Sequence, residues 1–290
     1  MKSKSRSIRP RSITLGRAFH ETRTYAILIL LSVVFLLPVA WALCSSLKSQ
    51  SEVLRFPPTW WPDDPRWENY LTVFEFQPFA IQFFNSVYIA ATVCAVTLVV
   101  STLAGYGFAR IRFRGSSVLF IIVLSALFIP PEATIVPLFR NAVELGWYDT
   151  HLPLIFFTVF SSTGAIATFV MRQAFLTIPV EFGEAARLDG AGAIRTFWEV
   201  MLPMVRPSLA AVVVLTCWHS WNQFLEPLVY LRSANLLTVP VALAQYTDPY
   251  SGPLYNIQSA ASVLSIVPLL IVFMFAQRHI VAGLTAGGLK

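Results

Sequence analysis

The sequence is poor in charge. Of its 290 residues only 12% are Asp, Glu, Lys or Arg, whereas an ordinary soluble domain carries roughly 25%. The deficit is uneven, because several windows of about 20 residues contain almost no charge at all. A helix of about 20 residues is long enough to cross a hydrocarbon core near 30 Å thick. Since the backbone must satisfy its own hydrogen bonds in lipid, these windows predict transmembrane helices.

Three further absences exclude whole classes of chemistry. Cys44, Cys94 and Cys217 are scattered with no paired spacing, so the sequence predicts neither a disulfide framework nor a cysteine metal site. The phosphate-binding pattern Gly-x-x-x-x-Gly-Lys-Ser/Thr is missing, which argues against an ATP site in this chain. The four histidines are isolated from one another, which argues against a membrane enzyme. We expect no catalytic residue, no metal site and no bound cofactor.

The apolar windows predict an all-α integral membrane protein with six transmembrane helices. The expected spans are residues 24–44, 85–108, 117–138, 151–171, 208–230 and 259–279. An even number of spans puts both termini on one side of the membrane. A cleaved signal peptide is the alternative for the first span, because Ala40-Trp41-Ala42 has the small-x-small form. The apolar stretch before it, however, is longer than the roughly 7–15 residues of a signal-peptide core.

The distribution of basic residues assigns the sides of the membrane. Only five of the 21 Lys and Arg lie in the loops on one side, namely Lys48, Arg55, Arg66, Arg140 and Arg232. The others lie in the N-terminal tail, in the loops near 109–116 and 172–207, and in the C-terminal tail. Cytoplasmic loops carry an excess of Lys and Arg, so both termini are expected in the cytoplasm. The net charge of +6 therefore follows from topology, and nothing indicates nucleic-acid binding.

A long loop after the first span is rich in proline and aromatic residues. Residues 56–62 read Phe-Pro-Pro-Thr-Trp-Trp-Pro, and Trp67 and Tyr70 follow. Proline cannot continue a helix, so irregular structure is expected, and Trp and Tyr favour the membrane–water interface. Two interpretations stay open: the loop caps the bundle, or it docks an extracytoplasmic partner.

A polar, helix-prone segment separates the fourth and fifth expected spans. Pro179 and Glu181 suit the start of a helix, while Asp189-Gly190 can end it because glycine tolerates positive φ. A second helical run is expected from about Ala193 to Met201, ended by the prolines that follow. The segment predicts two short helices joined by a bend, with Ala185 and Ala186 permitting close approach. The apolar residues expected to anchor a partner are Phe182, Leu188, Phe197 and Trp198. An amphipathic hairpin on the inner leaflet is the alternative.

The spacing in this segment resembles the EAA loop of binding-protein-dependent ABC importers, which docks the permease on a cytoplasmic ATPase. That pattern is Glu-Ala-Ala, three residues, Gly, nine residues, an aliphatic residue, any residue, then Leu-Pro. The residues that carry the resemblance are Glu184, Ala185, Ala186, Asp189, Gly190, Val200, Leu202 and Pro203. Val200 replaces the more usual Ile. The resemblance implies that Glu184, Ala185, Ala186, Asp189, Gly190, Leu202 and Pro203 couple the chain to the ATPase.

Other segments are similar to the maltose-type carbohydrate permeases of this class. They are Asn85-Ser86-Val87, Ile178-Pro179, Leu188-Asp189-Gly190-Ala191, Trp221-Asn222, Pro227-Leu228 and the ending Gly283-Leu284-Thr285-Ala286-Gly287. The resemblance implies a type I ABC importer permease fold, ATP-driven uptake of a sugar or sugar-like solute, and a bacterial or archaeal cell membrane. The implied partners are a second, different permease subunit, a cytoplasmic ATPase dimer that binds ATP and Mg, and an extracytoplasmic solute-binding protein.

The expected organisation follows from the spans and the resemblance. Residues 1–23 form a basic cytoplasmic tail beside membrane lipid, 24–44 the first transmembrane helix, and 45–80 an extracytoplasmic loop. Residues 81–279 form the ABC transmembrane core, with the cytoplasmic EAA loop at 172–207. Residues 280–290 form a cytoplasmic tail.

A cluster in the fifth expected span is the candidate solute path, namely Trp218, His219, Trp221, Asn222 and Gln223. Polar groups within lipid are costly and tend to face a cavity or a neighbouring helix. Lining the path and packing between helices therefore both stay open, and His219 alone suits a hydrogen-bonded structural role. Glu132 and Glu226 fall near the outer ends of their spans, where a carboxylate reaches water.

Three alternative functions stay open. A permease of the same class for a non-sugar solute would share every feature above. An ion-coupled secondary transporter would show inverted repeats and intramembrane charge, and a membrane enzyme would show a catalytic constellation. The sequence shows no internal repeat and little charge within the expected spans.

Overall fold

Three long helices dominate the computed structural model, which describes residues 15–250 and 252–287. They are α1 (Leu15–Ser46), α4 (Phe79–Arg110) and α15 (Tyr255–Gly287). Each contains a stretch long and apolar enough to cross a membrane. Most of the expected N-terminal tail, residues 1–14, and residues 288–290 of the C-terminal tail lie outside the described residues.

Three further apolar stretches are bent pairs of helices. First, α5 (Ser116–Ser125) and its 3₁₀ turn η1 (Ala126–Phe128) meet α6 (Pro131–Glu144) at 102°. Second, α7 (Leu152–Val159) meets α8 (Ser162–Thr177) at 40°. Third, α10 (Ala193–Arg195), the π-helical turn η2 (Thr196–Met201) and α11 (Leu202–Met204) meet α12 (Arg206–Trp221) at 75°. The described residues hold three membrane-length helices, or up to six spans if each bent pair counts as one.

The continuous helix predicted over residues 117–138 is wrong. The chain leaves the 3₁₀ turn at Ile129, and Pro130 takes an extended conformation before Pro131 opens α6. Proline lacks the N–H that a helix interior requires, although a first turn tolerates it. The helix predicted over residues 208–230 is also interrupted, since α12 ends at Trp221 and α13 (Leu225–Tyr230) begins after a short turn.

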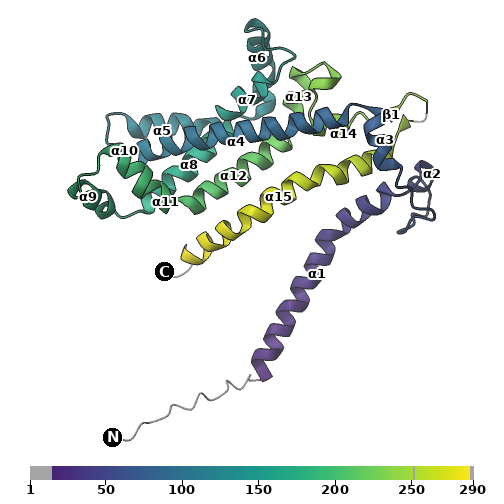
Figure 1. The fold of residues 1–290 in the computed structure, drawn as a ribbon, viewed down its shortest axis with the longest axis horizontal. Helices are drawn as coiled ribbons and strands as arrows, with labels where there is room; N and C mark the ends of the chain where they lie inside the picture. The colour runs from purple at the N-terminus through teal and green to yellow at the C-terminus, as the bar shows by residue number, and fades with distance from the viewer. Residues whose placement is uncertain (1–14, 251, 288–290) are drawn as a thin grey trace, which may run out of the picture.

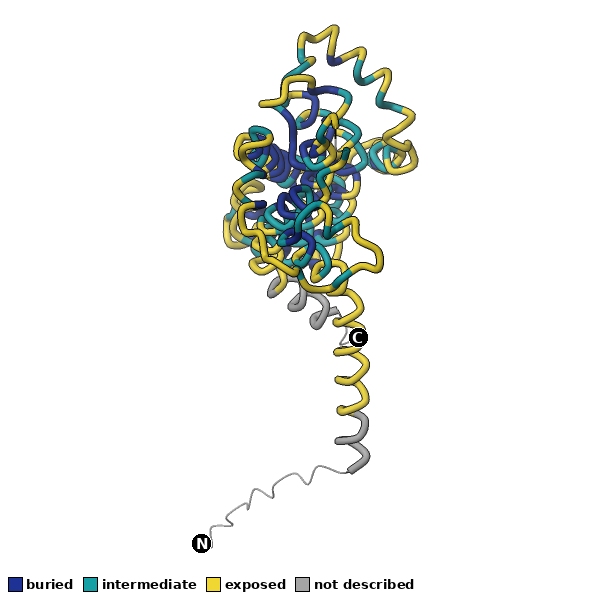
Figure 2. Tube along the Cα trace, turned by 90° about the vertical axis from the view of Figure 1, so that its right-hand side faces the viewer, coloured by how far each residue is buried: buried dark blue, intermediate teal, exposed yellow. Residues whose placement is uncertain are grey.

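The core of the bundle is built on α4. Figure 1 shows α4, α8 and α12 side by side, with α15 along one flank and α6, α7 and α13 on the opposite side; α4 packs against both α8 and α12. Gly105 permits the closest part of the α4–α8 contact, because a Cβ there would lie 2.7 Å from Met171 Cβ. Figure 2 shows the buried residues gathered in this bundle, whereas α1 is exposed along most of its length.

The remaining short elements lie at the two ends of the bundle. One end, here called the α3 end, carries α2 (Gln50–Val53), α3 (Asn69–Phe76), the 3₁₀ turn η3 (Ala234–Leu236), α14 (Val239–Leu243) and a hairpin of β1 (Thr247–Asp248) and β2 (Gly252–Pro253). The strands are antiparallel, with Thr247 opposite Pro253. The other end, called the α9 end, carries α9 (Val180–Leu188), α10 and α11.

Polar side chains fasten the α3 end. The Asn85 amide donates to the carbonyls of Asn235 (2.8 Å) and Leu237 (3.1 Å), and Ser86 Oγ accepts from Val239 N (2.8 Å). The Asn85-Ser86 pair, noted in the sequence as a family feature, therefore satisfies backbone groups of a turn some 150 residues later.

A second polar junction ties the loop after α1 to the bundle. The Asn69 amide donates to Ser46 O (2.8 Å) and Lys48 O (2.9 Å), and its oxygen accepts from Asn256 Nδ2 (3.0 Å). Lys48 is fully buried: its ammonium donates to Thr59 O and lies 4.8 Å from the centroid of the Trp41 ring. These contacts hold the loop, whose aromatic residues Phe56, Trp61 and Trp67 are exposed.

Candidate functional site

The first candidate site is the α9 segment, residues 179–204. Pro179 precedes α9, and Glu181 lies in its first turn, where negative charge is favourable. The helix ends at Leu188, and Gly190 then adopts φ +81°. The N–H of Ala191 returns to Ala186 O at 2.9 Å and closes the end of the helix. The positive φ at position 190 favours glycine. Steric crowding is not the reason, since nothing lies within 4 Å of a Cβ added there.

In the second half of the segment, helical structure extends further along the chain than the sequence predicts. A helical run was expected to end near Met201, but the wide turn η2 leads directly into α11, with Pro203 in its first turn. Leu202 N–H reaches back five residues to Phe197 O, the spacing of a π turn. The chain breaks instead at Val205, where it turns by 75° into α12.

Inward-facing side chains hold the α9 segment on the bundle. The Phe197 ring lies 4.9 Å from that of Tyr106 and 6.3 Å from that of Phe175. The Arg110 guanidinium, from the end of α4, donates to Phe175 O (2.7 Å) and to Ile178 O at the end of α8. Phe197 is buried in the core of its own chain, so its predicted role as an anchor for a partner is wrong.

The outward face of the segment carries most of the motif. Glu184, Ala185, Asp189 and Gly190 are exposed, whereas Leu202 and Pro203 are half-buried and Ala186 is buried. Apolar side chains surround them without cover, with Leu188 90% and Trp198 60% exposed. Within the part of the chain that the structure describes, the Glu184 carboxylate forms no hydrogen bond or ion pair. The segment is a bent platform that presents the Glu184 carboxylate among small and apolar groups.

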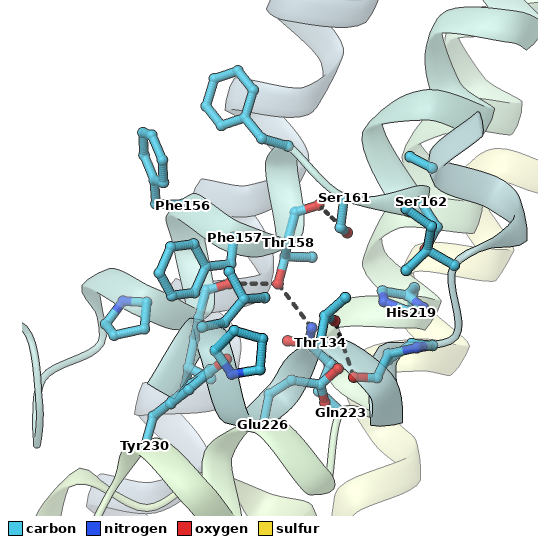
Figure 3. A pocket seen from close by; sticks show the side chains of 18 residues that line it. Thr134, Phe156, Phe157, Thr158, Ser161, Ser162, His219, Gln223, Glu226 and Tyr230 are labelled. Atoms are coloured by element: carbon cyan, nitrogen blue, oxygen red, sulfur yellow. Dashed lines mark hydrogen bonds between the residues drawn. The ribbon is translucent and has the colours of Figure 1, made fainter. Parts of the chain in front are cut away.

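The second candidate site is a cavity of about 480 Å³ on the side of the bundle that carries α6, α7 and α13. Its walls come from η1, α6, α7, the start of α8, the end of α12 and α13. In Figure 3, Thr134, Gln223 and Glu226 lie together, His219 lies beyond them, and the rings of Phe156 and Phe157 lie across the space. The cavity combines apolar and aromatic surface with a small set of polar groups, as solute sites commonly do.

The structure separates the five residues predicted for the solute path. His219 and Gln223 line the cavity. Trp218 is exposed and lines a neighbouring hollow of about 220 Å³ together with His219. Trp221 is instead buried against Phe83, with ring centroids 5.8 Å apart, and exposed Asn222 donates to Trp218 O at 2.7 Å.

Several residues that line the cavity were not predicted. Thr134, Thr158, Ser161, Ser162 and Tyr230 come from segments far apart in the sequence, and Glu226 was assigned only to the outer end of a span. Thr158 orients Gln223, since its hydroxyl accepts from Gln223 Nε2 (2.8 Å) and donates to Leu154 O (2.5 Å). No sequence signal joins these positions, because only the bends of the helix pairs bring them together.

Hydrogen bonds of Asp149 join the loop before α7 to the chain just after α13, and both helices wall the cavity. Asp149 lies in the loop between α6 and α7 with φ +56°. Its carboxylate accepts from Arg232 N (2.8 Å), Ser233 N (2.9 Å) and Ser233 Oγ (2.5 Å), just after α13. The Ser233 hydroxyl and the two backbone N–H groups hold the pKa of Asp149 below its usual value.

Among the residues that the structure describes, no group of three or more His, Cys, Asp or Glu is placed to hold a metal ion. What the geometry offers instead is a bundle with apolar helices of membrane length, a bent platform at one end and a cavity on one side.

Sequence comparison gives the family to which this bundle belongs. Residues 98–286 match the model of the binding-protein-dependent transport system inner membrane component. The chain belongs to this family. It is therefore a transport subunit and not itself an enzyme, and it works with a solute-binding protein.

Named relatives are similar to this chain in sequence, and a solved structure is similar to it in fold. The chain is 35% identical to the arabinooligosaccharides transport system permease protein AraQ of Halalkalibacterium halodurans, over 100% of both chains. It is 30% identical to the sn-glycerol-3-phosphate transport system permease protein UgpE of Yersinia enterocolitica, over 90% of this chain and 94% of that one. A chain of a bacterial ABC transporter that imports the acidic polysaccharide alginate shares the fold, with a TM-score of 0.76, 22% identity, and 93% and 99% of the two chains covered.

Proposed function

We propose that this chain forms half of the translocation path of an ABC importer for a sugar or sugar-like solute in a bacterial or archaeal cell membrane. It crosses the membrane six times, through α1, α4, the α5–α6 pair, the α7–α8 pair, α12 and α15, with both termini and the α9 segment in the cytoplasm. It pairs with a second, different permease subunit, and a solute-binding protein delivers the solute from outside. The similarity to an arabinooligosaccharide permease supports a sugar as the transported solute.

The observation that carries the proposal is the α9 segment. Most of its motif residues face outward on a platform that Arg110 and Phe197 fasten to α4 and α8. A cytoplasmic ATPase dimer, which binds ATP and Mg, docks on Glu184, Ala185, Asp189, Gly190 and their neighbours Ala186, Leu202 and Pro203. Movement of the ATPases is passed through this platform to α8 and α12, which wall the cavity. A non-sugar solute, as in the glycerol phosphate relative, is the alternative.

The docking is tested by charge reversal at Glu184. The tagged chain is purified from its native membrane in mild detergent, and the proteins that accompany it are identified by mass spectrometry. Glu184→Lys should remove the ATPase from the complex and abolish solute uptake, while the second permease stays. Glu75→Lys, the same change on an exposed residue of α3 at the other end of the bundle, should keep the ATPase. Retention of the ATPase and of uptake in Glu184→Lys would refute the docking.

A further inference from the structure

We propose that the cavity selects uncharged, hydroxyl-rich solutes over acidic ones, with Glu226 as the group that decides. This inference rests on the proposed function, because it names the substrate class of the same path. It is independent of the names of the relatives, which include permeases for both neutral and anionic solutes.

The first step is the sign of charge in the cavity. Among the described residues that line it there is neither Lys nor Arg, the one carboxylate is that of Glu226, and the one imidazole is that of His219. An anionic solute is recognised by guanidinium or ammonium groups that offset its charge. Here a phosphate, sulfonate or uronate group would meet a carboxylate in surroundings of low dielectric constant, where repulsion between like charges is strong.

The second step is that Glu226 is available to a ligand. Within the described part of the chain its carboxylate forms no hydrogen bond and no ion pair, although the residue is half-buried. A carboxylate accepts hydrogen bonds through two oxygens, and two neighbouring sugar hydroxyls donate with matching spacing. Such charge-assisted bonds are the stronger class of hydrogen bond.

The third step is a buried hydroxyl without a partner. Tyr230 lines the same cavity, is only 1% exposed, and its phenol oxygen has no hydrogen-bond partner among the described residues. A buried polar group left unpaired costs free energy, and because this oxygen has almost no surface open to the cavity, a solute pairs with it only when the Tyr230 side chain turns toward the cavity. A sugar hydroxyl suits such a pairing, since it both donates and accepts.

The fourth step is the remaining surface. Gln223 is held by Thr158 through its amide nitrogen, and no described group donates to its carbonyl oxygen. Across the cavity lie the rings of Phe156 and Phe157 (Figure 3), which offer faces for the C–H surface of a pyranose or furanose ring. Acceptors on one side and aromatic surface on the other match a neutral sugar.

The test measures uptake by the native strain with the chain deleted and then restored as wild type or variant. Radiolabelled arabinotriose and maltotriose serve as neutral probes, and sn-glycerol 3-phosphate and trigalacturonate as acidic ones. We expect the chain to be required for a neutral probe. Glu226→Gln, which keeps shape and removes charge, should slow that uptake about tenfold, and Tyr230→Phe about fivefold. Glu226→Arg should abolish it.

Controls separate the site from folding and from the proposed function. Glu144→Gln makes the same change at an exposed residue at the far end of α6 and should leave uptake unchanged. All variants are compared at equal membrane abundance, and Tyr230→Phe removes no hydrogen bond of the folded chain. Neutral uptake that is unchanged in Glu226→Gln and Tyr230→Phe would overturn the inference.

Two other outcomes are also decisive. If the chain is required only for an acidic probe, and Glu226→Gln leaves or raises that uptake, the inference fails while the proposed function stands. If deletion of the chain changes the uptake of no probe, the proposed function and the inference fail together.

Discussion

The α9 segment and the cavity are both polar interruptions of an apolar chain, but they are built in opposite ways. The α9 segment is continuous in sequence, fastens itself with its own buried side chains, and turns its motif outward. The cavity takes its lining residues from several helices that are far apart in the sequence and turns them inward. A docking surface can be encoded by local spacing, whereas a solute site in a bundle depends on where each helix bends.

The largest expected effect comes from a substitution that disturbs the α7–α8 bend, which shapes the cavity. At Gly164 an added Cβ would lie 1.9 Å from Val159 O, across the bend between α7 and α8. Gly164→Ala should therefore destabilise the chain by about 3 kcal/mol. The measurement is the temperature of aggregation of the purified chain in detergent.

Gly107→Ala is the matched control, because nothing lies within 4 Å of an added Cβ there. It should change stability by no more than about 1 kcal/mol. Equal stability of the Gly164 and Gly107 variants would show that the bend is not held by this contact.

The next largest effect is expected at Arg110, which fastens the α9 segment to the bundle. Arg110→Met removes the donor to Phe175 O and Ile178 O and should cost about 2 kcal/mol. Solute uptake should fall more than ATPase copurification, because the platform still docks but no longer moves with α4. Arg112→Met, an exposed neighbour, should have neither effect. Loss of copurification without loss of stability would contradict this role.

A smaller change tests the backbone of the platform itself. Gly190→Val places a β-branched residue at φ +81° and should cost about 1–2 kcal/mol locally. The end of α9 should shift, and uptake should fall roughly tenfold at normal membrane abundance. At Gly192, where φ is −67°, the same change should be tolerated. Equal uptake by the two variants would mean that the left-handed turn is not required for coupling.

The smallest effect is expected at Asp149, whose hydrogen bonds join two walls of the cavity. Because hydrogen bonds lower the pKa of Asp149, its carboxylate stabilises the fold above its unfolded pKa of about 3.9, and this contribution is lost as pH falls through the lower folded pKa. Asp149→Asn should cost about 1 kcal/mol at pH 7 and less at pH 3. Thermal denaturation of the wild type and the variant at both pH values measures the difference. A gap that stays constant with pH would contradict this account.

The fold and the sites differed in how far the sequence predicted them. The apolar windows placed the long helices α1, α4 and α15, because burial in lipid leaves a continuous signal. The bends escaped prediction, although Pro130-Pro131 marks one of them, since proline alone does not say whether a helix kinks or ends. Fixed spacing singled out the α9 segment. Two residues that line the cavity, His219 and Gln223, belong to the cluster predicted as a solute path, which stays a prediction, whereas no sequence signal pointed to the lining residues of α6 and α7.

The Asn69 amide has a consequence for the order in which the chain is made. It joins the end of α1 to α15 through Asn256, a residue 187 positions later. A ribosome releases the early segments long before Asn256 emerges, so the last hydrogen bond of this junction forms only when nearly the whole chain has been synthesised. A chain truncated before α15 leaves the Asn69 oxygen without its partner Asn256. The complete set of hydrogen bonds at Asn69 is therefore present only in chains that have been synthesised as far as α15.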